Sequence, residues 1–384
     1  MPESMPDFDF ESIRPYRDDE IPAAMARIAH SEYFPLLASY VYPDRDTEDV
    51  RAMIRGMRSI DEFQQQVMYA VNRQILQRSS TAFTYGGTAN IDPGVRYLFV
   101  SNHRDIMLDS SLLQLILYLN GHTTTEITFG ANLMSHPLVI DIGKSNKMFR
   151  VERGGSKKEF LRFSQLHSAY IRHTLTARRQ SVWIAQRNGR TKDGNDRTEP
   201  GLIRMFACSL PGSPARALAE LNIVPVAVSY EWEPCDILKA VELYKSRTAP
   251  YVKAPGEDLN SILTGILAPK GHIHIEICSP LSSYDLTELE TLPRNEYHKG
   301  VATLIDRRIN SAYYLHPNNY IAHDLREGSQ RYADRYTPDE YRAFMRRLNL
   351  LLQTDLPEPD VLKDIFLGIY ANPLDSRQKS LAGR

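Results

Sequence analysis

A histidine followed closely by two carboxylates is the feature of this 384-residue chain that could most readily do chemistry. His103 comes just after a short apolar run, and Asp105 and Asp109 follow it before the next apolar stretch. An imidazole titrates near neutral pH, and a carboxylate on its far nitrogen fixes the tautomer and stabilises the charged ring. With a hydroxyl as acceptor, such a pair makes an alkoxide-like nucleophile. From the residues alone, His103 is a candidate base and Asp109 a candidate orienting group, with Asp105 as a competing orienter. A purely structural histidine–aspartate pair is the alternative interpretation.

A strand and a helix must hold this pair. The apolar run before His103 predicts a strand, and Ser111–Leu119 predicts an apolar helix after it. Further short apolar runs alternate with helix-length segments, which indicates a largely parallel sheet with helices on its faces. The predicted strands are Tyr97–Val100, Glu126–Phe129, Val182–Ala185, Ile223–Ser229 and Ile273–Cys278.

The segments on either side of this alternation are predicted to be helical. Ser59 and Glu62 have the spacing of a capping box ahead of a run with helical periodicity. We therefore predict an α/β fold in which a mostly parallel mixed sheet is flanked by helices. A helical N-terminal annex would cover residues 1–80, the α/β domain residues 81–290, and a helical extension packed on it residues 291–384.

Composition restricts the class of protein. Hydrophobic residues make up 42% and charged residues 24% of the chain, which is typical of a globular protein. The three cysteines have no C-x-x-C spacing, so a disulfide framework or zinc site is not expected and a reducing cytosol fits best. Met1–Phe10 is acidic and does not resemble a signal peptide. No apolar run approaches the ~20 residues that span a bilayer, so any membrane contact is expected to be peripheral.

Positive charge is concentrated in one segment of a chain whose formal net charge is only −1. Between Lys144 and Arg204 there are fifteen Lys and Arg residues against five Asp and Glu residues. Such a stretch near a reactive loop favours anionic ligands or an anionic surface. A solvated basic helix and loop is the alternative interpretation.

Four blocks that occur in order across residues 80–235 resemble the glycerophospholipid acyltransferase family, which contains glycerol-3-phosphate and lysophosphatidic acid acyltransferases. The first resembles the Asn-His-Arg block of that family, the second its block ending in Phe-Ile-Arg-Arg, the third its Gly-Arg-Ser-Arg-Thr-Gly segment, and the fourth its strand with an inward proline. In this chain they are Asn102–Arg104, Gly130–Leu133 with Met148–Gly154, Gly189–Gly194 and Ile223–Glu231.

Two departures from the family pattern bear on function. Five residues separate His103 from Asp109 where the family has four, although Leu112 still falls where the family has its leucine. The glutamate of the third block is also missing, because Gln186 or Arg187 stands at its place. Replacing an anion by a cation changes what the pocket can hold, so the identity of the acceptor stays open.

The resemblance implies transfer of a fatty acyl group from acyl-CoA or acyl carrier protein to a hydroxyl of glycerol-3-phosphate or a lysophospholipid, a step of phospholipid biosynthesis. His103 would take the hydroxyl proton and Asp109 would align the ring. Because guanidinium forks match phosphate oxygens in pairs, the candidates for the acceptor phosphate are cationic. They are Arg153, Arg187, Arg190 and Lys192.

The resemblance implies no cofactor beyond the acyl thioester co-substrate and no metal. The expected partners are the acyl donor, the phosphorylated glycerol or lysolipid acceptor, and an anionic membrane surface, with no nucleic acid. The expected location is the cytoplasm, peripheral on the membrane. Donor, acylated position, chain length and oligomeric state stay open. Two alternatives remain: an acyltransferase for a different lipid hydroxyl, and a catalytically silent lipid-binding or acyl-carrier-binding relative.

Three other patterns are better explained without function. Residues 103–105 spell the kinase catalytic tripeptide, but Ser110 stands where a kinase has Asn. Residues 143–145 resemble the end of a P-loop, but Leu138 replaces its first glycine. Two histidines and a glutamate that alternate with isoleucines predict a half-exposed strand rather than a metal site. These are His272, His274 and Glu276.

Overall fold

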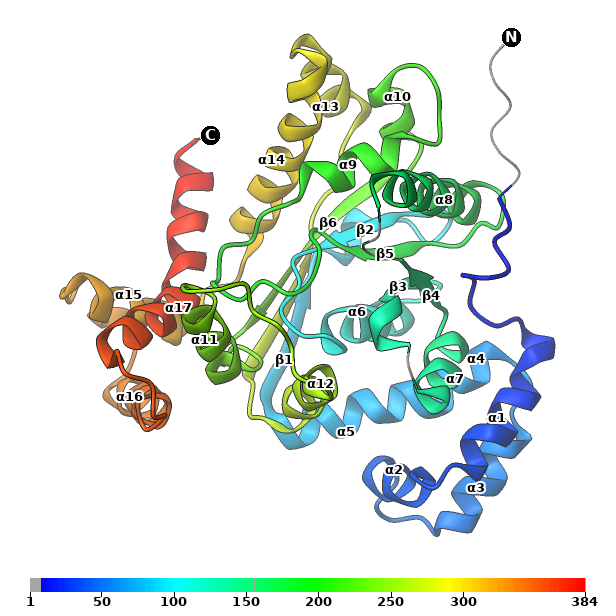
Figure 1. The fold of residues 1–384 in the computed structure, drawn as a ribbon, viewed down its shortest axis with the longest axis horizontal. Coiled ribbons are helices and arrows are strands. Elements are labelled where there is room, and N and C mark those ends of the chain that lie inside the picture. The colour runs from blue at the N-terminus through cyan, green and yellow to red at the C-terminus, as the bar shows by residue number, and fades with distance from the viewer. Residues whose placement is uncertain (1–7, 135, 153, 155, 384) are drawn as a thin grey trace.

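The computed structural model describes residues 8–134, 136–152, 154 and 156–383 (Figure 1). At its centre is a seven-stranded sheet in the order β1-β7-β6-β2-β5-β3-β4. Neighbouring strands are parallel except for the antiparallel pair β6–β7. The predicted fold class, a mostly parallel mixed sheet flanked by helices, is confirmed. The strands are β1 (Ser80–Gly86), β2 (Leu98–Ser101), β3 (Glu126–Gly130), β4 (Met148–Val151), β5 (Val182–Ala185), β6 (Ile223–Tyr230) and β7 (Gly271–Ile277).

Helices cover both faces of the sheet. Side chains alternate between the faces, so Leu98 and Val100 of β2 join one hydrophobic core and Phe99 joins the other. The first core is closed by helices drawn above the sheet in Figure 1: α8 (Lys157–Thr176), α9 (Pro200–Ala207), α10 (Pro214–Ala219), α13 (Ser283–Glu288) and α14 (Arg294–Ala312). The second is closed by helices drawn below it: α5 (Tyr69–Ser79), α6 (Leu108–Leu119) and α12 (Glu257–Leu267).

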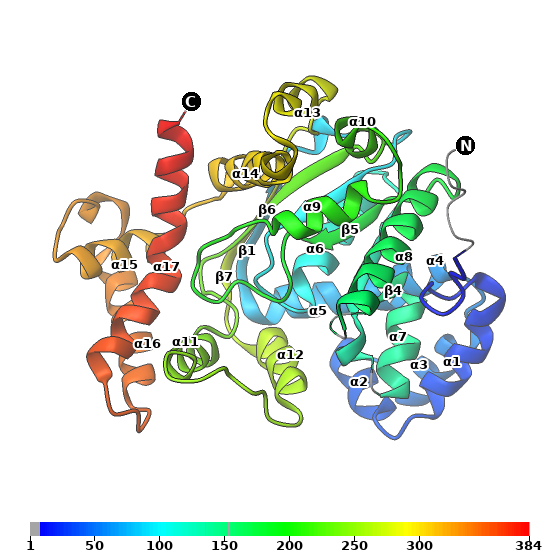
Figure 2. The ribbon, with the colours of Figure 1, turned by 45° about the horizontal axis from the view of Figure 1, so that its top comes forward.

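Two groups of helices flank opposite ends of the sheet in both ribbon views (Figures 1 and 2), and each has its own core. The N-terminal group packs beside α7 (Pro137–Ser145) and runs through a π-helical turn, Gln64–Met68, into α5. It comprises α1 (Ile21–His30), α2 (Phe34–Val41), α3 (Thr47–Gly56) and α4 (Ile60–Phe63). The second group comprises α11 (Asp236–Lys245), α15 (Pro317–Glu327), α16 (Pro338–Leu352) and α17 (Pro359–Ala382).

Local sequence signals are reproduced at several points. The side chain of Ser59 accepts the Glu62 N–H and the Glu62 carboxylate accepts the Ser59 N–H, which is the predicted capping box. Strand β5 has the predicted bounds. Helix α11 lies inside the predicted 81–290 unit yet packs with the C-terminal helices, and the division of the chain into three parts stays a prediction.

The two strands that the sequence analysis missed, β1 and β4, are the two edges of the sheet. Their side chains are mostly exposed or half-buried, whereas every residue of β5 and β6 is buried. An edge strand needs no continuous apolar run, because it packs against fewer neighbours. Burial therefore made the central strands predictable and left the edge strands without a signal.

In the part of the chain that the structure describes, every helix is too short or too polar to span a bilayer.

Candidate active site

His103 and Asp109 meet where β2 gives way to α6. The His103 Nδ1 atom lies 2.9 Å from Asp109 Oδ2. The Asp109 carboxylate is fully buried, and the His103 ring is 13% exposed at the wall of a cleft. A ring that donates its Nδ1–H to a carboxylate carries its lone pair on Nε2 when neutral. The arrangement can therefore take a proton at Nε2 while the carboxylate stabilises the charged ring.

Asp109 is held in place by three further donors. Its Oδ2 atom accepts the backbone N–H groups of Arg104 at 2.6 Å and Asp105 at 2.9 Å, and its Oδ1 atom accepts the Tyr230 hydroxyl at 2.8 Å. Burial, reinforced by the adjacent Asp109 charge, raises the pKa of Tyr230 well above its usual range. The phenol therefore stays a donor, and the carboxylate cannot rotate away from His103.

Asp105, the competing orienter, has a different task. Its Oδ1 atom accepts the N–H groups of Met107 and Leu108, both at 2.9 Å, and so caps the start of α6. Burial first, and then the Asp109 charge, raise the pKa of Asp105. Of the two aspartates, the structure brings Asp109 to the histidine ring.

Asn102 ties the end of β2 to the neighbouring strand β6. Its amide donates to the Val228 carbonyl at 2.9 Å and its oxygen accepts the Val228 N–H at 2.7 Å. The same amide donates to Asp196 at 2.9 Å. The backbone on one side of His103 is therefore fixed by side-chain bonds across the sheet.

Arg104 fixes the backbone on the other side of His103. Its buried guanidinium contacts Asp196 at 2.6 Å and Glu233 at 3.1 Å. The Lys239 ammonium, also buried, contacts Glu233 at 2.5 Å and donates to the Arg104 carbonyl at 2.8 Å. The two cations and two anions balance, which makes burial of all four tolerable. Within the Asn-His-Arg block, the outer residues thus position the histidine between them.

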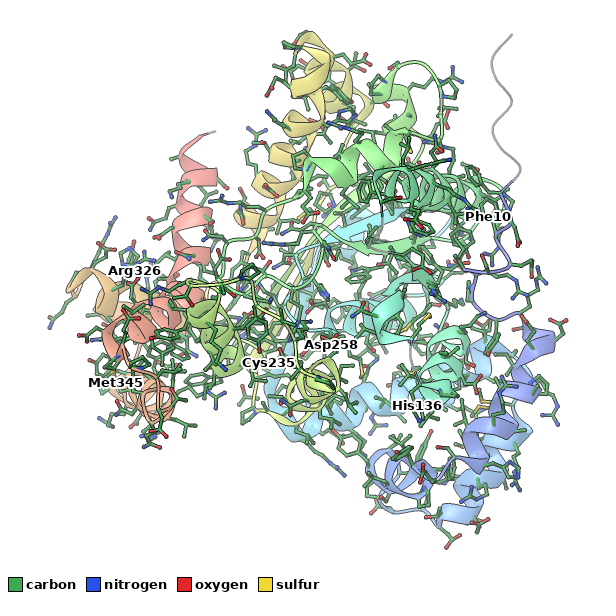
Figure 3. All side chains as sticks on the ribbon, in the orientation of Figure 1. Phe10, His136, Cys235, Asp258, Arg326 and Met345 are labelled. Atoms are coloured by element: carbon green, nitrogen blue, oxygen red, sulfur yellow. The ribbon has the colours of Figure 1, made fainter. Side chains whose placement is uncertain are left out.

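The cleft beside His103 is small, with a volume of about 80 Å³. The Trp183 ring meets the His103 ring edge-on at 5.8 Å between centroids. Asp258, at the start of α12 and labelled in Figure 3, lines the opposite wall, where it contacts Lys253 at 2.5 Å and accepts from Asn132 at 3.0 Å. The loop before α12 and the loop after β3 therefore meet across this cleft.

The predicted phosphate ligands are not all brought together. Arg190 lines the cleft, and the N–H of Thr191, next to it, donates to the His103 carbonyl at 2.7 Å. In the described part of the chain, the buried Arg190 Nη1 atom has no hydrogen-bond partner.

Among the described residues, two further predicted cations, Arg187 and Lys192, do not line the cleft. Lys192 forms an ion pair with Glu242 on α11. Arg187 is half-buried and is not among the described residues that line the cleft. Arg153 lies outside the described residues. Of the three that the structure describes, Arg190 is the one that lines the cleft with His103.

The sequence analysis did not single out Tyr230, Trp183, Lys253 or Asp258. Tyr230 ends β6 and Trp183 lies on β5, and both strands are sheet neighbours of β2. Only the strand order brings them to His103, and no local pattern encodes that order. Lys253 and Asp258 come from a loop far along the chain.

The alternating residues of β7 agree with their structural interpretation. Burial alternates along the strand, with the isoleucines buried and His272, His274 and Glu276 half-exposed. Among the described residues, no group of three or more His, Cys, Asp or Glu side chains is arranged to hold a metal ion.

Comparison with known proteins gives the class of this site. Residues 82–229 match the family model described as Acyltransferase, a segment that runs from β1 into β6 and includes His103, Asp109 and Arg190. Residues 82–229 therefore resemble an acyltransferase domain, which supports the resemblance recognised in the sequence.

Among solved structures, the chain is similar to the 1-acyl-sn-glycerophosphate (LPA) acyltransferase PlsC from Thermotoga maritima. The TM-score is 0.39 and the sequence identity 12%, and the alignment covers 77% of this chain and 97% of that one. None of the curated proteins matches the chain in sequence.

Proposed function

We propose that this protein transfers a fatty acyl group from acyl-CoA or acyl carrier protein to a hydroxyl of glycerol-3-phosphate or a lysophospholipid, in phospholipid biosynthesis. The observation that carries the proposal is the 2.9 Å contact between His103 Nδ1 and buried Asp109, at a cleft wall shared with Arg190, inside the segment that matches the acyltransferase family model.

In the proposed reaction His103 Nε2 takes the proton of the acceptor hydroxyl as its oxygen attacks the thioester carbonyl. The resulting C–O bond replaces the C–S bond, and the thiolate leaves and is protonated. Asp109 supports the imidazolium that forms between these steps, without forming a covalent intermediate itself. No cofactor is needed beyond the acyl thioester.

Arg190 is the proposed ligand of the acceptor phosphate. Its unpartnered, buried Nη1 atom is a donor without a partner at the site where an anionic acceptor would enter. A guanidinium can hold two phosphate oxygens in one plane, which would fix the hydroxyl relative to His103. Arg187 and Lys192 do not line the cleft. Arg153 stays a candidate from the sequence that lies outside the described residues.

A membrane surface is the proposed location, because the proposed product is amphiphilic. The basic segment would contact anionic headgroups, although several of its cations already pair with carboxylates. These pairs are Arg150–Glu152, Arg172–Glu220, Arg178–Glu126 and Lys192–Glu242.

Helix α12 offers a second, apolar contact with the membrane. Leu259, Leu263 and Leu267 are 56%, 49% and 63% exposed, and their i, i+4, i+8 spacing places them on one stripe. The stripe begins one residue after Asp258 at the cleft, so a docked helix would bring the cleft to the lipid.

Vesicle binding separates the two contacts. Electrostatic docking predicts that retention on anionic vesicles falls steeply as salt is raised. Retention that resists high salt but falls for Leu259→Ser with Leu263→Ser would contradict it and favour docking through α12.

The test of the base is His103→Ala, assayed for acyl transfer from both classes of thioester. We expect a loss of activity of about 10²–10⁴-fold with an unchanged melting temperature, because the ring acts on the acceptor proton. His30→Ala, an exposed histidine on α1, is the matched control and should keep full activity. Normal turnover by His103→Ala would refute the assignment.

A panel of acceptors with mass detection of products separates the proposal from its two alternatives. Acylation of glycerol-3-phosphate or a lysophospholipid supports it. A product formed only with another lipid hydroxyl would indicate a different acceptor, as the missing glutamate near Gln186 allows. Lipid binding without any product, across acceptors and donors, would indicate a catalytically silent relative.

A further inference from the structure

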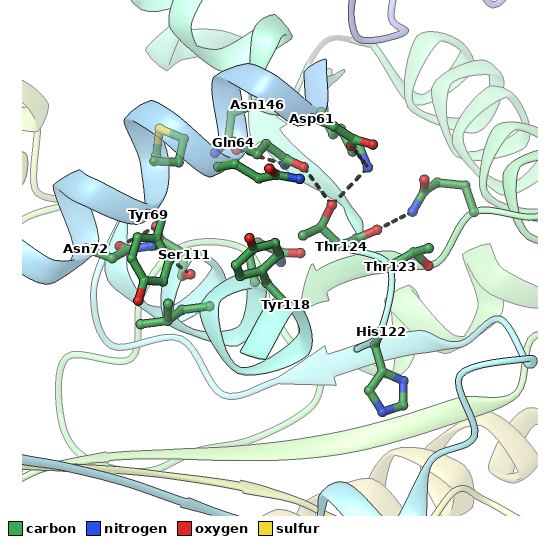
Figure 4. Close-up of a pocket in the computed structure, with 16 residues that line it drawn as sticks. Asp61, Gln64, Tyr69, Asn72, Ser111, Tyr118, His122, Thr123, Thr124 and Asn146 are labelled. Atoms are coloured by element: carbon green, nitrogen blue, oxygen red, sulfur yellow. Dashed lines mark hydrogen bonds and ion pairs between the residues drawn. The ribbon is translucent and has the colours of Figure 1, made fainter. Parts of the chain in front are cut away.

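A second hollow lies at the amino ends of β3, β4 and β5, whereas His103 lies at the carboxyl end of β2. It has a volume of about 360 Å³ and is walled by the π-helical turn and α5 on one side and by α6 on the other (Figure 4). Its floor is formed by the residues just before β3, β4 and β5, whereas the His103 cleft lies at the carboxyl ends of β2, β3 and β5. Among the described residues, the two hollows share no lining side chain.

Lys147 supplies the charge of this pocket. Its side chain is only 15% exposed, and its ammonium lies 3.7 Å from a carboxylate oxygen of Asp61, a side chain that is 75% exposed. The Lys147 ammonium donates to the Thr124 hydroxyl at 2.9 Å. Burial lowers the pKa of Lys147, with the charge of Asp61 opposing it. The nearby Glu126 carboxylate is engaged by Arg178 at 2.6 Å.

The backbone at Lys147, a residue that lines the pocket, is strained. Its φ is +58°, a left-handed conformation that non-glycine residues rarely adopt. Such strain persists only where the surrounding structure enforces it, and it occurs often at functional sites. The π-helical turn across the pocket is a second irregular element of the kind found at such sites.

Amides and hydroxyls form the polar wall. Gln64 donates to Asn146 at 3.0 Å and accepts from Thr124 at 2.7 Å, and Figure 4 shows these side chains grouped together on one side of the pocket. An amide has two donors and two acceptor lone pairs, so Gln64 and Asn146 keep capacity for a ligand.

The wall at the other end of the pocket is partly apolar. The rings of Tyr69 and Tyr118 meet edge-on at 5.9 Å between centroids, and Met68 and Leu115 lie beside them. A pocket with one charged group, a few amides and an apolar end is built to orient a small molecule rather than only to hold water.

We propose that this pocket binds a small monocarboxylate that also carries hydrogen-bonding groups, with its carboxylate on Lys147 and its polar groups against Gln64 and Asn146. A ligand with a single negative charge fits best. Lys147 is the only lysine or arginine among the described lining residues, and the Asp61 carboxylate would repel a dianion. A phosphate monoester would need at least a second cation or a guanidinium fork.

The pocket joins the N-terminal helices to the α/β body, so a bound ligand stabilises the folded chain. Thermal unfolding of the full-length protein is measured with 10 mM lactate, glycerate, serine or glutamine, and with acetate or inorganic phosphate at matched ionic strength. We expect at least one of the first four to raise the melting temperature by about 4 °C near a hundredfold excess over its Kd, and to exceed both acetate and phosphate.

Variants assign the effect to the pocket. Lys147→Met should weaken binding of the active probe at least tenfold in calorimetry, whereas Lys144→Met should not. Lys144 lies three residues away on α7, over the Tyr16 ring, and does not line the pocket.

Either of two results would overturn the proposal. One is that none of the four polar carboxylates changes the melting temperature, and the other is that phosphate acts more strongly than all of them. Acyl transfer is not part of this readout, so failure here leaves the proposed function standing, and the reverse also holds.

Discussion

Buried charged groups have many partners at the carboxyl ends of the parallel strands and few at the amino ends. At the carboxyl ends, Asp109 receives four hydrogen-bond donors, and Arg104 is enclosed by two carboxylates. At the amino ends, the Lys147 ammonium has a hydroxyl and one distant, exposed carboxylate. Asp109 and Arg104 therefore have their partners within the protein, whereas the Lys147 ammonium keeps capacity for an anionic ligand.

The difference shows what each region is built to hold. A general base works only if its ring is fixed, and Asp109, itself held by further donors, fixes the His103 ring beside a cleft of about 80 Å³. A binding pocket needs unused donors and room, which the Lys147 side offers in about 360 Å³.

The largest effect is expected from Asp109→Asn. The amide would turn an N–H₂ group toward the N–H donors of Arg104 and Asp105, or toward Tyr230, and would lose the charge that supports the His103 imidazolium. We expect acyl transfer to fall about 10²–10⁴-fold. Initial rates with a thioester donor measure it, with the exposed Asp355→Asn as control. An unchanged rate would mean that acyl transfer does not depend on the Asp109 carboxylate.

Arg104→Met tests how much the buried ion pairs with Asp196 and Glu233 contribute to the free energy of unfolding. It leaves Asp196 and Glu233 buried with one cation fewer, and breaking such a network costs about 3–5 kcal/mol. Urea unfolding at neutral pH measures the loss. Arg335→Met, at an exposed arginine, should change the free energy of unfolding by less than about 0.5 kcal/mol. Equal effects for the two variants would contradict a tightly coupled network.

Lys270 is expected to make the free energy of unfolding depend on pH. It is buried just before β7, and burial lowers its pKa to about 8. Between pH 8 and its unfolded value near 10.5 the unfolded chain holds more protons, so the free energy of unfolding rises with pH, by about 3 kcal/mol in full. Urea unfolding from pH 7.5 to 10 should show this rise in the wild type and lack it in Lys270→Met. A parallel course for both proteins would contradict the assignment.

The smallest effect is expected from Lys147→Met. Removing the ammonium loses about 1 kcal/mol of hydrogen bonding to Thr124 but also removes a desolvated charge with a weak partner. The two terms offset, and we expect the free energy of unfolding to change by less than about 1 kcal/mol. Urea unfolding measures it beside Arg104→Met. A cost as large as that of Arg104→Met would erase the contrast between the two ends.

Much of the fold could be predicted from the sequence, and less of the site. The buried strands β5 and β6 were predictable because continuous apolar runs signal burial on both faces, whereas the edge strands carry no such signal. His103 and Asp109 were selected from residue type and a family resemblance. Their meeting at 2.9 Å agrees with that selection, while their catalytic roles stay predictions.

The cations near the site were the least predictable part. Arg190 and Lys192 are two residues apart, yet one lines the cleft and the other pairs with Glu242 on α11. Their types and spacing look equally suited to a phosphate. Lys192 is drawn away from the cleft by a carboxylate on a helix far along the chain.

By itself, the sequence determined the class of fold, the central strands and the candidate histidine. Apolar runs and residue types are local features of the sequence, so they can be recognised without the tertiary structure. Only the tertiary structure decided which aspartate meets the ring, that Tyr230 and Trp183 lie near it, and that Lys147 lines a separate pocket at the amino ends of the strands. Those facts depend on strand order and on which helices face one another, and they arise from contacts between residues far apart in the chain.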